Sequence, residues 1–157
     1  MSYIKNYYKK ADYFLEIYSA IEKLYQEYQS DDACSFIIST MIQSFIFFDI
    51  KVEIKKASDY VFNEKKGELV LEICKYFGAD IYVSGQGAKS YMDYAMLDKF
   101  TESGIKIEWQ TFIHPGYYQG SELLKFVEGL SCLDILFHNG IEKSREIFNL
   151  SLFRCAE

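Results

Sequence analysis

Several features that define other protein classes are missing from this chain of 157 residues. Its four cysteines include no Cys-x-x-Cys pair, and no signal-peptide pattern precedes them. We therefore expect a reducing, cytoplasmic environment without structural disulfides. We also predict no metal site, because the spacings of the cysteines and the two histidines fit no usual zinc pattern. Cys34, Cys74 and Cys132 lie in apolar runs and are expected to be small buried thiols.

Positive charge and long apolar runs are also scarce. The formal net charge is -6 and there is no basic stripe, so the chain is a poor electrostatic match for nucleic acid or anionic lipid. The small basic cluster of Lys5, Lys9 and Lys10 is interpreted as a solvated helix face. The most apolar run, residues 36–48, is too short to span a bilayer and contains Gln43. We expect a core helix there and no membrane insertion.

Hydrophobic and aromatic residues, in contrast, are abundant. Half of the residues are hydrophobic and 18% are aromatic, which excludes a disordered chain. At this length we expect one domain, residues 1–157, with a substantial core. Some of the 14 tyrosines should lie at the rim of a pocket, where a ring is half buried while its hydroxyl meets water.

Hydrophobic periodicity predicts a helical beginning. Apolar residues recur at helical spacing over 12–29, and Ser30, Asp31 and Asp32 supply N-cap chemistry for a second helix over 33–48. The two should form an antiparallel helical hairpin. Three strands are expected later in the chain, over 52–56, 79–83 and 105–109. Helices are expected over 65–77, from about 89, and over 94–102. Two further helices, over 130–137 and 142–148, should lie on either side of a turn at Asn139-Gly140.

The alternation of strands and helices over 52–109 predicts right-handed crossovers. The expected fold class is therefore α/β and helix-rich: a helical hairpin followed by a small, mainly parallel sheet with covering helices. In such sheets ligands bind at the carboxyl ends of the strands. Two glycine-rich loops, 84–90 and 111–120, follow predicted strands, and we expect both to line one site.

The first of these loops does not carry a complete nucleotide motif. A P-loop needs four residues between its first glycine and Gly-Lys-Ser/Thr, and Lys89 lies too close to Gly85. The dinucleotide fingerprint is matched only in part. Gly85 and Gly87 nevertheless allow positive φ and close approach to the backbone, so an anionic or oxygen-rich group could bind there at a helix start. A turn without a ligand fits these residues equally well.

The second loop and the segment after it contain the candidate catalytic residues. His114 could act as a general base, donate to a sugar or acyl oxygen, or simply fix its loop through a backbone hydrogen bond. Asp134 stands among apolar residues and needs a partner, because an unpaired buried carboxylate costs several kcal/mol. It could orient His114, cap a helix, or pair with Arg145 or a lysine. His138, at a predicted helix end, is interpreted as a cap.

The remaining candidates are hydrogen-bonding residues suited to a polar small molecule. Gln110, Tyr117 and Gln119 could bind such a ligand or form a network that holds the loop. Ser84 lacks the Gly-x-Ser-x-Gly elbow of a nucleophile and is grouped with the glycine loop. The predicted site comprises catalytic His114 and Asp134 with substrate-binding Ser84, Gly85, Gly87, Gln110, Tyr117 and Gln119.

Over about residues 4–148 the chain resembles the WbqC-like family. The resemblance is carried by short segments in the right order and spacing: Tyr8-x-Lys10-Ala11-Asp12-Tyr13-Phe14, Gly78-Ala79-Asp80, Tyr82 to Ala88, His114 to Gln119, Leu130 to Phe137 and Asn139-Gly140. Members of this family are typically encoded among bacterial surface-polysaccharide and O-antigen genes. The resemblance implies an enzyme that modifies a sugar or related small metabolite, or transfers a group onto it.

Family members usually begin with an apolar strand, a Gln-Pro-x-Tyr-x-Pro-type motif and a tract with Trp and an Asn-Arg pair, none of which is found here. The resemblance thus implies that the chain corresponds to the carboxyl-terminal two thirds of a family member. We expect a transferase of polysaccharide biosynthesis or, alternatively, a non-catalytic binding domain or one half of a split protein. An amino-terminal partner chain or self-association would then cover exposed apolar surface. The sequence indicates no particular cofactor.

Overall fold

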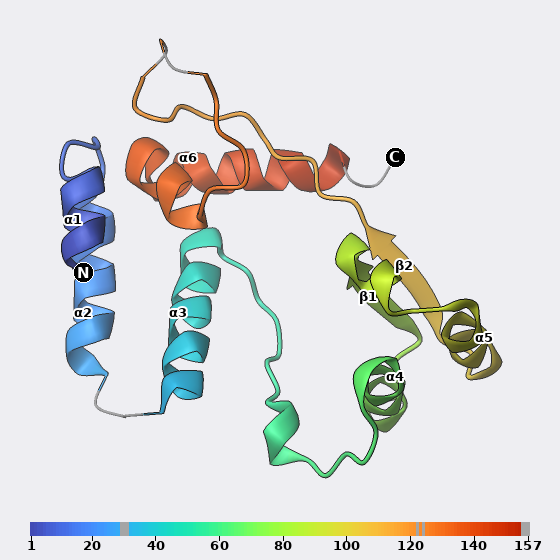
Figure 1. The fold of residues 1–157 in the computed structure, drawn as a ribbon. Helices are drawn as coiled ribbons and strands as arrows, with labels where there is room; N and C mark the ends of the chain where they lie inside the picture. The colour runs from blue at the N-terminus through green and yellow to red at the C-terminus, as the bar shows by residue number, and fades with distance from the viewer. Residues whose placement is uncertain (29–31, 122, 124, 155–157) are drawn as a thin grey trace. The chain divides into compact units, whose positions relative to one another are not determined.

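A computed structural model describes residues 1–28, 32–121, 123 and 125–154. The chain divides into two compact units (Figure 1). We call them the helical unit, Met1–Val52 with Ile113–Glu157, and the sheet unit, Glu53–Phe112. The α/β fold class is confirmed, and the two units are described in turn.

The helical unit contains α1 (Ser2–Tyr8), α2 (Phe14–Glu27), α3 (Ala33–Phe48) and α6 (Cys132–Arg154). The expected hairpin is present: α2 and α3 run antiparallel, and α6 packs against both (Figure 1). Their apolar faces form one core because helical spacing places these residues on facing stripes. The buried residues of this core are Ile17, Ile21, Phe47, Leu136 and Phe137.

Both ends of α3 are fixed by polar groups. At its start, the Asp32 carboxylate accepts hydrogen bonds of 3.1 Å from the backbone N–H groups of Cys34 and Ser35, which confirms Asp32 as the N-cap. Ser30 and Asp31, the other expected capping residues, lie outside the described residues. At its end, Arg145 of α6 donates from Nε to the Phe47 carbonyl (2.6 Å) and from a terminal nitrogen to the Ile46 carbonyl (2.9 Å). A cation there also favours the helix dipole.

A kink at Gly140 divides α6 into two helical segments. The sequence predicted separate helices on either side of a turn at Asn139-Gly140, and the non-helical backbone of Gly140 does separate two helices there. Gly140 has φ 71° and ψ 174°, which few residues other than glycine adopt. A Cβ atom at this position would also lie only 2.6 Å from Cε1 of Tyr13. Backbone conformation and close packing therefore both require glycine.

The sheet unit contains η1 (Ala57–Asp59), α4 (Lys66–Tyr76), β1 (Ile81–Gly85), η2 (Gln86–Ser90), α5 (Tyr94–Glu102) and β2 (Lys106–Gln110). The two strands are parallel, in a register that pairs Gly85 with Gln110. α5 packs against β2 and contacts α4, as expected of covering helices. The buried core of this unit comprises Leu71, Cys74, Met92, Met96, Phe100 and Ile105.

Three predicted elements differ from the structure. The strand expected over 79–83 is β1 at Ile81–Gly85, so Ser84 and Gly85 belong to a strand and not to the predicted loop. No strand forms over residues 52–56. Val52 is 58% exposed and Ile54 37%, so the alternating pattern has neither a buried face nor a partner strand to pair with in the described part of the chain. The helix expected from about residue 89 is the short 3-10 helix η2, which begins immediately after β1.

The cysteines correct another expectation. Cys74 is buried as predicted, but Cys34 and Cys132 are exposed, because both lie near the starts of helices rather than within packed faces. All three are free thiols. Among the described residues, no helix combines the length and the apolar character needed to cross a membrane.

Candidate functional site

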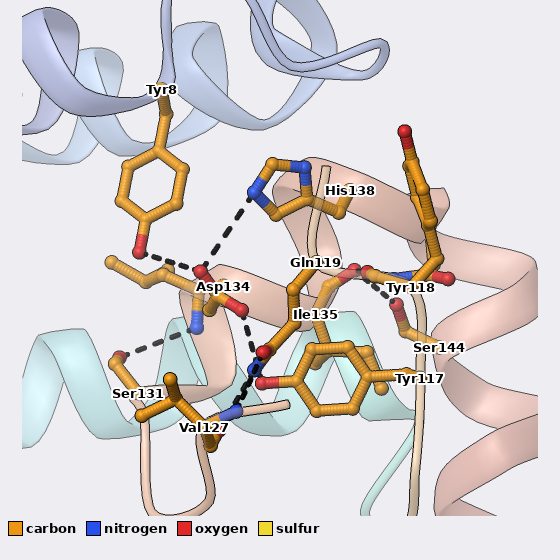
Figure 2. A network of polar contacts seen from close by, with 12 residues as sticks. Tyr8, Tyr117, Tyr118, Gln119, Val127, Ser131, Asp134, Ile135, His138 and Ser144 are labelled. Atoms are coloured by element: carbon orange, nitrogen blue, oxygen red, sulfur yellow. Dashed lines mark hydrogen bonds and ion pairs between the residues drawn. The ribbon is translucent and has the colours of Figure 1, made fainter. Parts of the chain in front are cut away.

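Asp134 is the polar centre of the helical unit. It lies in the first turn of α6, is only 5% exposed, and has apolar neighbours along the chain. Figure 2 shows three side chains converging on its carboxylate. Tyr8 donates to Oδ1 (3.0 Å), Tyr117 donates to Oδ2 (3.1 Å), and Nε2 of His138 lies 3.8 Å from Oδ1. The buried carboxylate is therefore satisfied by hydrogen bonds from distant parts of the chain.

The two tyrosines that contact Asp134 stay protonated and donate hydrogen bonds to its carboxylate. The ring of Tyr8, at the end of α1, stacks on Phe137 with centroids 4.4 Å apart. Burial, followed by the hydrogen bond to Asp134, raises the pKa of Tyr8 well above its usual range. Burial also raises the pKa of Tyr117 to about 12; the Asp134 carboxylate adds to this, while Gln119 acts in the opposite direction. Both hydroxyls thus keep the hydrogen atoms that they donate.

His138 lies one helical turn after Asp134, with its side chain 16% exposed. Its ring contacts the edges of Tyr8 and Tyr118, with centroids 5.8 and 6.2 Å away. It also packs against Gly120, where a Cβ atom would come within 2.6 Å of Cε1. The structure thus places this ring beside a carboxylate and two aromatic rings, and the capping role expected from the sequence stays a prediction.

A pocket of about 550 Å³ opens onto the Asp134–Tyr117 pair, within the size range of small-molecule sites. Its lining combines aromatic rings, a carboxylate, an ammonium group and an amide. The lining residues are Tyr117, Tyr118, Gln119, Ser121, Lys125, Phe126, Val127, Leu130 and Asp134. Tyrosines thus lie at a pocket, as the composition predicts. Asp134 is buried and Lys125 is exposed, so the negative charge lies at the inner end and the positive charge at the rim.

Gln119 closes the loop that forms one side of this pocket. Its Nε2 donates to the carbonyl of Val127 (2.8 Å), and its Oε1 accepts from the N–H of the same residue (2.9 Å). The Gln119 side chain therefore makes two hydrogen bonds to one backbone residue, as a paired strand residue would, and it joins positions that are eight residues apart. This supports the structural alternative considered for Gln119, while a substrate-binding role stays a prediction.

His114 lies beside two of the lining residues. Its ring is 5.9 Å from that of Tyr117 and 5.7 Å from that of Phe126. Nδ1 lies 3.1 Å from the Pro115 carbonyl, which can only accept a hydrogen bond. We therefore assign the proton of the neutral ring to Nδ1, which makes Nε2 the acceptor, as a general base requires.

Asp134 contacts Tyr8, Tyr117 and His138, which were not among the partners predicted for it. Tyr117 donates to Asp134 and lies beside the ring of His114, so the two predicted catalytic residues are connected through Tyr117. Of the alternatives, Arg145 bonds the carbonyls at the end of α3. The catalytic roles of His114 and Asp134 stay predictions.

The other predicted residues lie together in the sheet unit. Gly85 pairs with Gln110 at the carboxyl ends of the two strands. Gln86 strengthens this edge by donating to the Gln110 carbonyl (3.1 Å) and to Oγ1 of Thr111 (3.3 Å). Ser84 is 3% exposed, and its hydroxyl donates to the adjacent Gly85 carbonyl at 3.4 Å. The strand ends thus meet at one edge, as parallel pairing requires.

The glycines of this loop differ from expectation in one respect. Gly85 has φ -71° and ψ 155°, and Gly87 is not among the positive-φ glycines, so neither uses the left-handed region. The reason is that the chain passes directly from β1 into a 3-10 turn of ordinary handedness. A Cβ atom at either position would meet nothing within 4 Å. Open space lies beside the backbone, and ligand binding there stays a prediction.

The predicted site residues thus form one group in each unit. Ser84, Gly85, Gly87 and Gln110 belong to the sheet unit, and His114, Tyr117, Gln119 and Asp134 to the helical unit. Sequence reasoning missed Tyr8, Lys125 and the contact of His138. The four-residue spacing of Asp134 and His138 on one helix could have revealed their contact. Tyr8 stands in the first segment of the family resemblance, but nothing in the sequence connected it with Asp134, because the two meet only through the tertiary fold.

Comparison with protein-family profiles identifies one family. A profile described as the WbqC-like protein family matches residues 1–146. An uncharacterized protein of Mycobacterium tuberculosis, Rv1507c, is 29% identical over 137 residues. That alignment covers 86% of this chain, and the chain spans 57% of the length of the mycobacterial protein. No solved structure matches the chain.

Proposed function

The chain belongs to the WbqC-like protein family, and from this premise we propose that it serves group transfer onto a sugar or related small metabolite. The setting would be the cytoplasmic biosynthesis of bacterial surface polysaccharide such as O-antigen, as the family resemblance suggests. The observation that carries the proposal is the buried Asp134 carboxylate, oriented by two tyrosine hydroxyls at the inner end of a pocket. Such a constellation suits a polar metabolite.

In this proposal Asp134 positions the acceptor substrate. Its carboxylate oxygens accept a hydrogen bond from a substrate hydroxyl or amine, which holds the nucleophile in one orientation. His114, in the tautomer with Nε2 as acceptor, takes the proton as the nucleophile attacks the donor. The new bond forms to the transferred group, and the leaving group departs with the electron pair of the bond that breaks. The loop of Gly85 and Gly87 belongs to the sheet unit, and we propose it separately as a binding place for an anionic or oxygen-rich group.

The test is a binding and activity screen on the full chain. Sugar nucleotides, simple sugars and acyl donors are offered to the wild type, to Asp134→Asn and to His114→Ala. We expect Asp134→Asn to weaken acceptor binding, and His114→Ala to slow turnover about 100-fold with binding retained. If all three proteins behave alike towards every ligand, the assigned roles are wrong.

One observation favours the alternative, a binding domain that works with another chain. α3 is apolar around most of its circumference, yet only Phe47 on it is buried. Ile37 is 65% exposed, Ile46 58% and Ile42 41%. A helix that is apolar all round is normally covered. We therefore propose, as the alternative function, that a second copy of this chain covers α3.

Light scattering tests this alternative. A covered α3 predicts self-association of the purified chain. Ile37→Asp should abolish that association, whereas Leu15→Asp, at a 78% exposed position on α2, should not. A chain that stays monomeric at high concentration contradicts the interaction proposal.

A further inference from the structure

The inner end of the pocket offers hydrogen-bond acceptors. A tyrosine hydroxyl has one hydrogen and two lone pairs, and the hydrogen of Tyr117 is engaged with Oδ2 of Asp134. Gln119 donates to the same hydroxyl oxygen and occupies one of its lone pairs, so Tyr117 presents its remaining lone pair to a ligand. The Asp134 carboxylate, when ionised, can only accept. A ligand group that reaches this end must itself donate, as a hydroxyl or an amino group does.

The rim of the same pocket offers the opposite chemistry. Lys125 supplies an ammonium group with three donors and a full positive charge. It is exposed, so it keeps its water and its freedom to reach a ligand. The rings of Phe126 and Tyr118 also line the pocket, and they provide apolar surface against the faces of a saturated ring.

We propose that this pocket binds an acidic polyhydroxy metabolite, whose hydroxyl groups donate to Asp134 and Tyr117 while its carboxylate or phosphate group meets Lys125. The inference deepens the proposed function and rests on it, because it names the class of the acceptor substrate. The reverse orientation is disfavoured: an anionic group beside Asp134 would place like charges together in a buried place. A neutral sugar would satisfy only the inner end, and a simple acid only the rim.

The experiment measures binding to the full chain by ligand-observed NMR and calorimetry. The acidic polyhydroxy probes are glucuronate, galacturonate and glucose 1-phosphate, so that carboxylate and phosphate are separate arms. Glucose and galactose lack the acid, and cyclohexanecarboxylate lacks the hydroxyl groups. The proteins are the wild type, Lys125→Met, Tyr117→Phe and, as a matched control, Lys23→Met, whose lysine lies on α2 with its side chain 71% exposed.

We expect the wild type to prefer an acidic sugar over its neutral counterpart by about fivefold or more, which corresponds to one ion pair at a partly exposed rim. Lys125→Met should remove that preference while leaving the affinity for neutral sugars unchanged, and Lys23→Met should behave as the wild type. Tyr117→Phe should weaken every hydroxyl-bearing probe and leave cyclohexanecarboxylate unaffected. If Tyr117→Phe is unfolded by circular dichroism, Lys125→Met decides the outcome.

The possible failures are distinct. If acidic and neutral sugars bind the wild type equally, and Lys125→Met changes nothing, the acid-specific inference is overturned while the sugar site stands. If the acid without hydroxyl groups binds as well as glucuronate, the requirement for donors at the inner end is overturned. If none of the probes binds at millimolar concentration, the proposed function itself is contradicted and this inference with it.

Discussion

The hydroxyl of Tyr8, in the first helix, donates a hydrogen bond of 3.0 Å to Oδ1 of Asp134, although 126 residues separate the two in the sequence. Tyr117 completes the arrangement from the opposite oxygen. Three segments of the helical unit are thereby fixed at one carboxylate (Figure 2). The first helix consequently supports the proposed binding site without lining it.

Removing the Tyr8 hydroxyl should destabilise the protein. Tyr8→Phe keeps the ring stacked on Phe137 and deletes a hydrogen bond to a buried carboxylate, so we expect a loss of about 2 kcal/mol in the free energy of unfolding. Urea denaturation measures this loss. Tyr7→Phe is the matched control, because Tyr7 is 79% exposed and its change should stay within about 0.5 kcal/mol. Equal losses in the two variants would show that the Asp134 contact is not stabilising.

The raised pKa of Tyr117 predicts a loss of stability in alkaline solution. The ordinary tyrosine pKa is 10.0 and the folded protein holds Tyr117 at about 12, so the unfolded chain releases this proton first. The stabilisation is complete below pH 10 and is lost as the pH rises from 10 towards 12. Tyr117→Phe should reduce the slope of unfolding free energy against pH in this window. The 44% exposed Tyr118 provides the control, and Tyr118→Phe should leave more of the slope intact.

Gly120 and Gly129 form a matched pair that isolates one contact. Both have positive φ, 81° and 74°, so alanine costs about 1–2 kcal/mol of backbone strain at each. Only at Gly120 would the new Cβ meet a neighbour, at 2.6 Å from Cε1 of His138. We expect Gly120→Ala to destabilise the protein more than Gly129→Ala and to shift the NMR resonances of the His138 ring. Identical effects of both substitutions would contradict the packing of Gly120 against this ring.

Arg145 should be irreplaceable by lysine. Its guanidinium donates to two carbonyls at the end of α3 at once, and a single ammonium group cannot reproduce that planar arrangement. Arg145→Lys should therefore recover little of the roughly 1–3 kcal/mol that Arg145→Met loses in thermal or urea unfolding. Lys143→Met, two residues earlier and with its side chain 62% exposed, is the control. Full recovery by lysine would mean that charge alone, rather than paired donation, holds the helix end.

The sequence predicted those elements whose signals are local. The helix over 94–102 matches α5 at both ends, because Asp93 caps it and its apolar residues keep a helical period. The parallel pairing of β1 and β2 follows from the helices between them. The strand over 52–56 failed for a physical reason: alternation describes two faces, but a strand also needs a neighbouring strand to bond with.

The candidate site was predictable only in part. Asp134 was recognised because a carboxylate among apolar residues requires a partner, and the partner is in fact supplied by Tyr8 and Tyr117. Tyr8 and Lys125 contact the site through folding over long or irregular stretches, and no spacing in the sequence encodes such contacts. Gln119 was recognised as a hydrogen-bonding residue, but its engagement with Val127 depends on the path of the loop.

The kink at Gly140 has a consequence for engineering this protein. The segment before it carries Asp134 and His138, while the segment after it carries Arg145, which secures α3. The backbone angles at Gly140 therefore help to set how the pocket beside Asp134 is aligned with the helical hairpin. Straightening the helix at this residue to raise thermal tolerance would shift the Asp134 pocket relative to α3, so stabilising changes are better sought at surface positions far from residue 140.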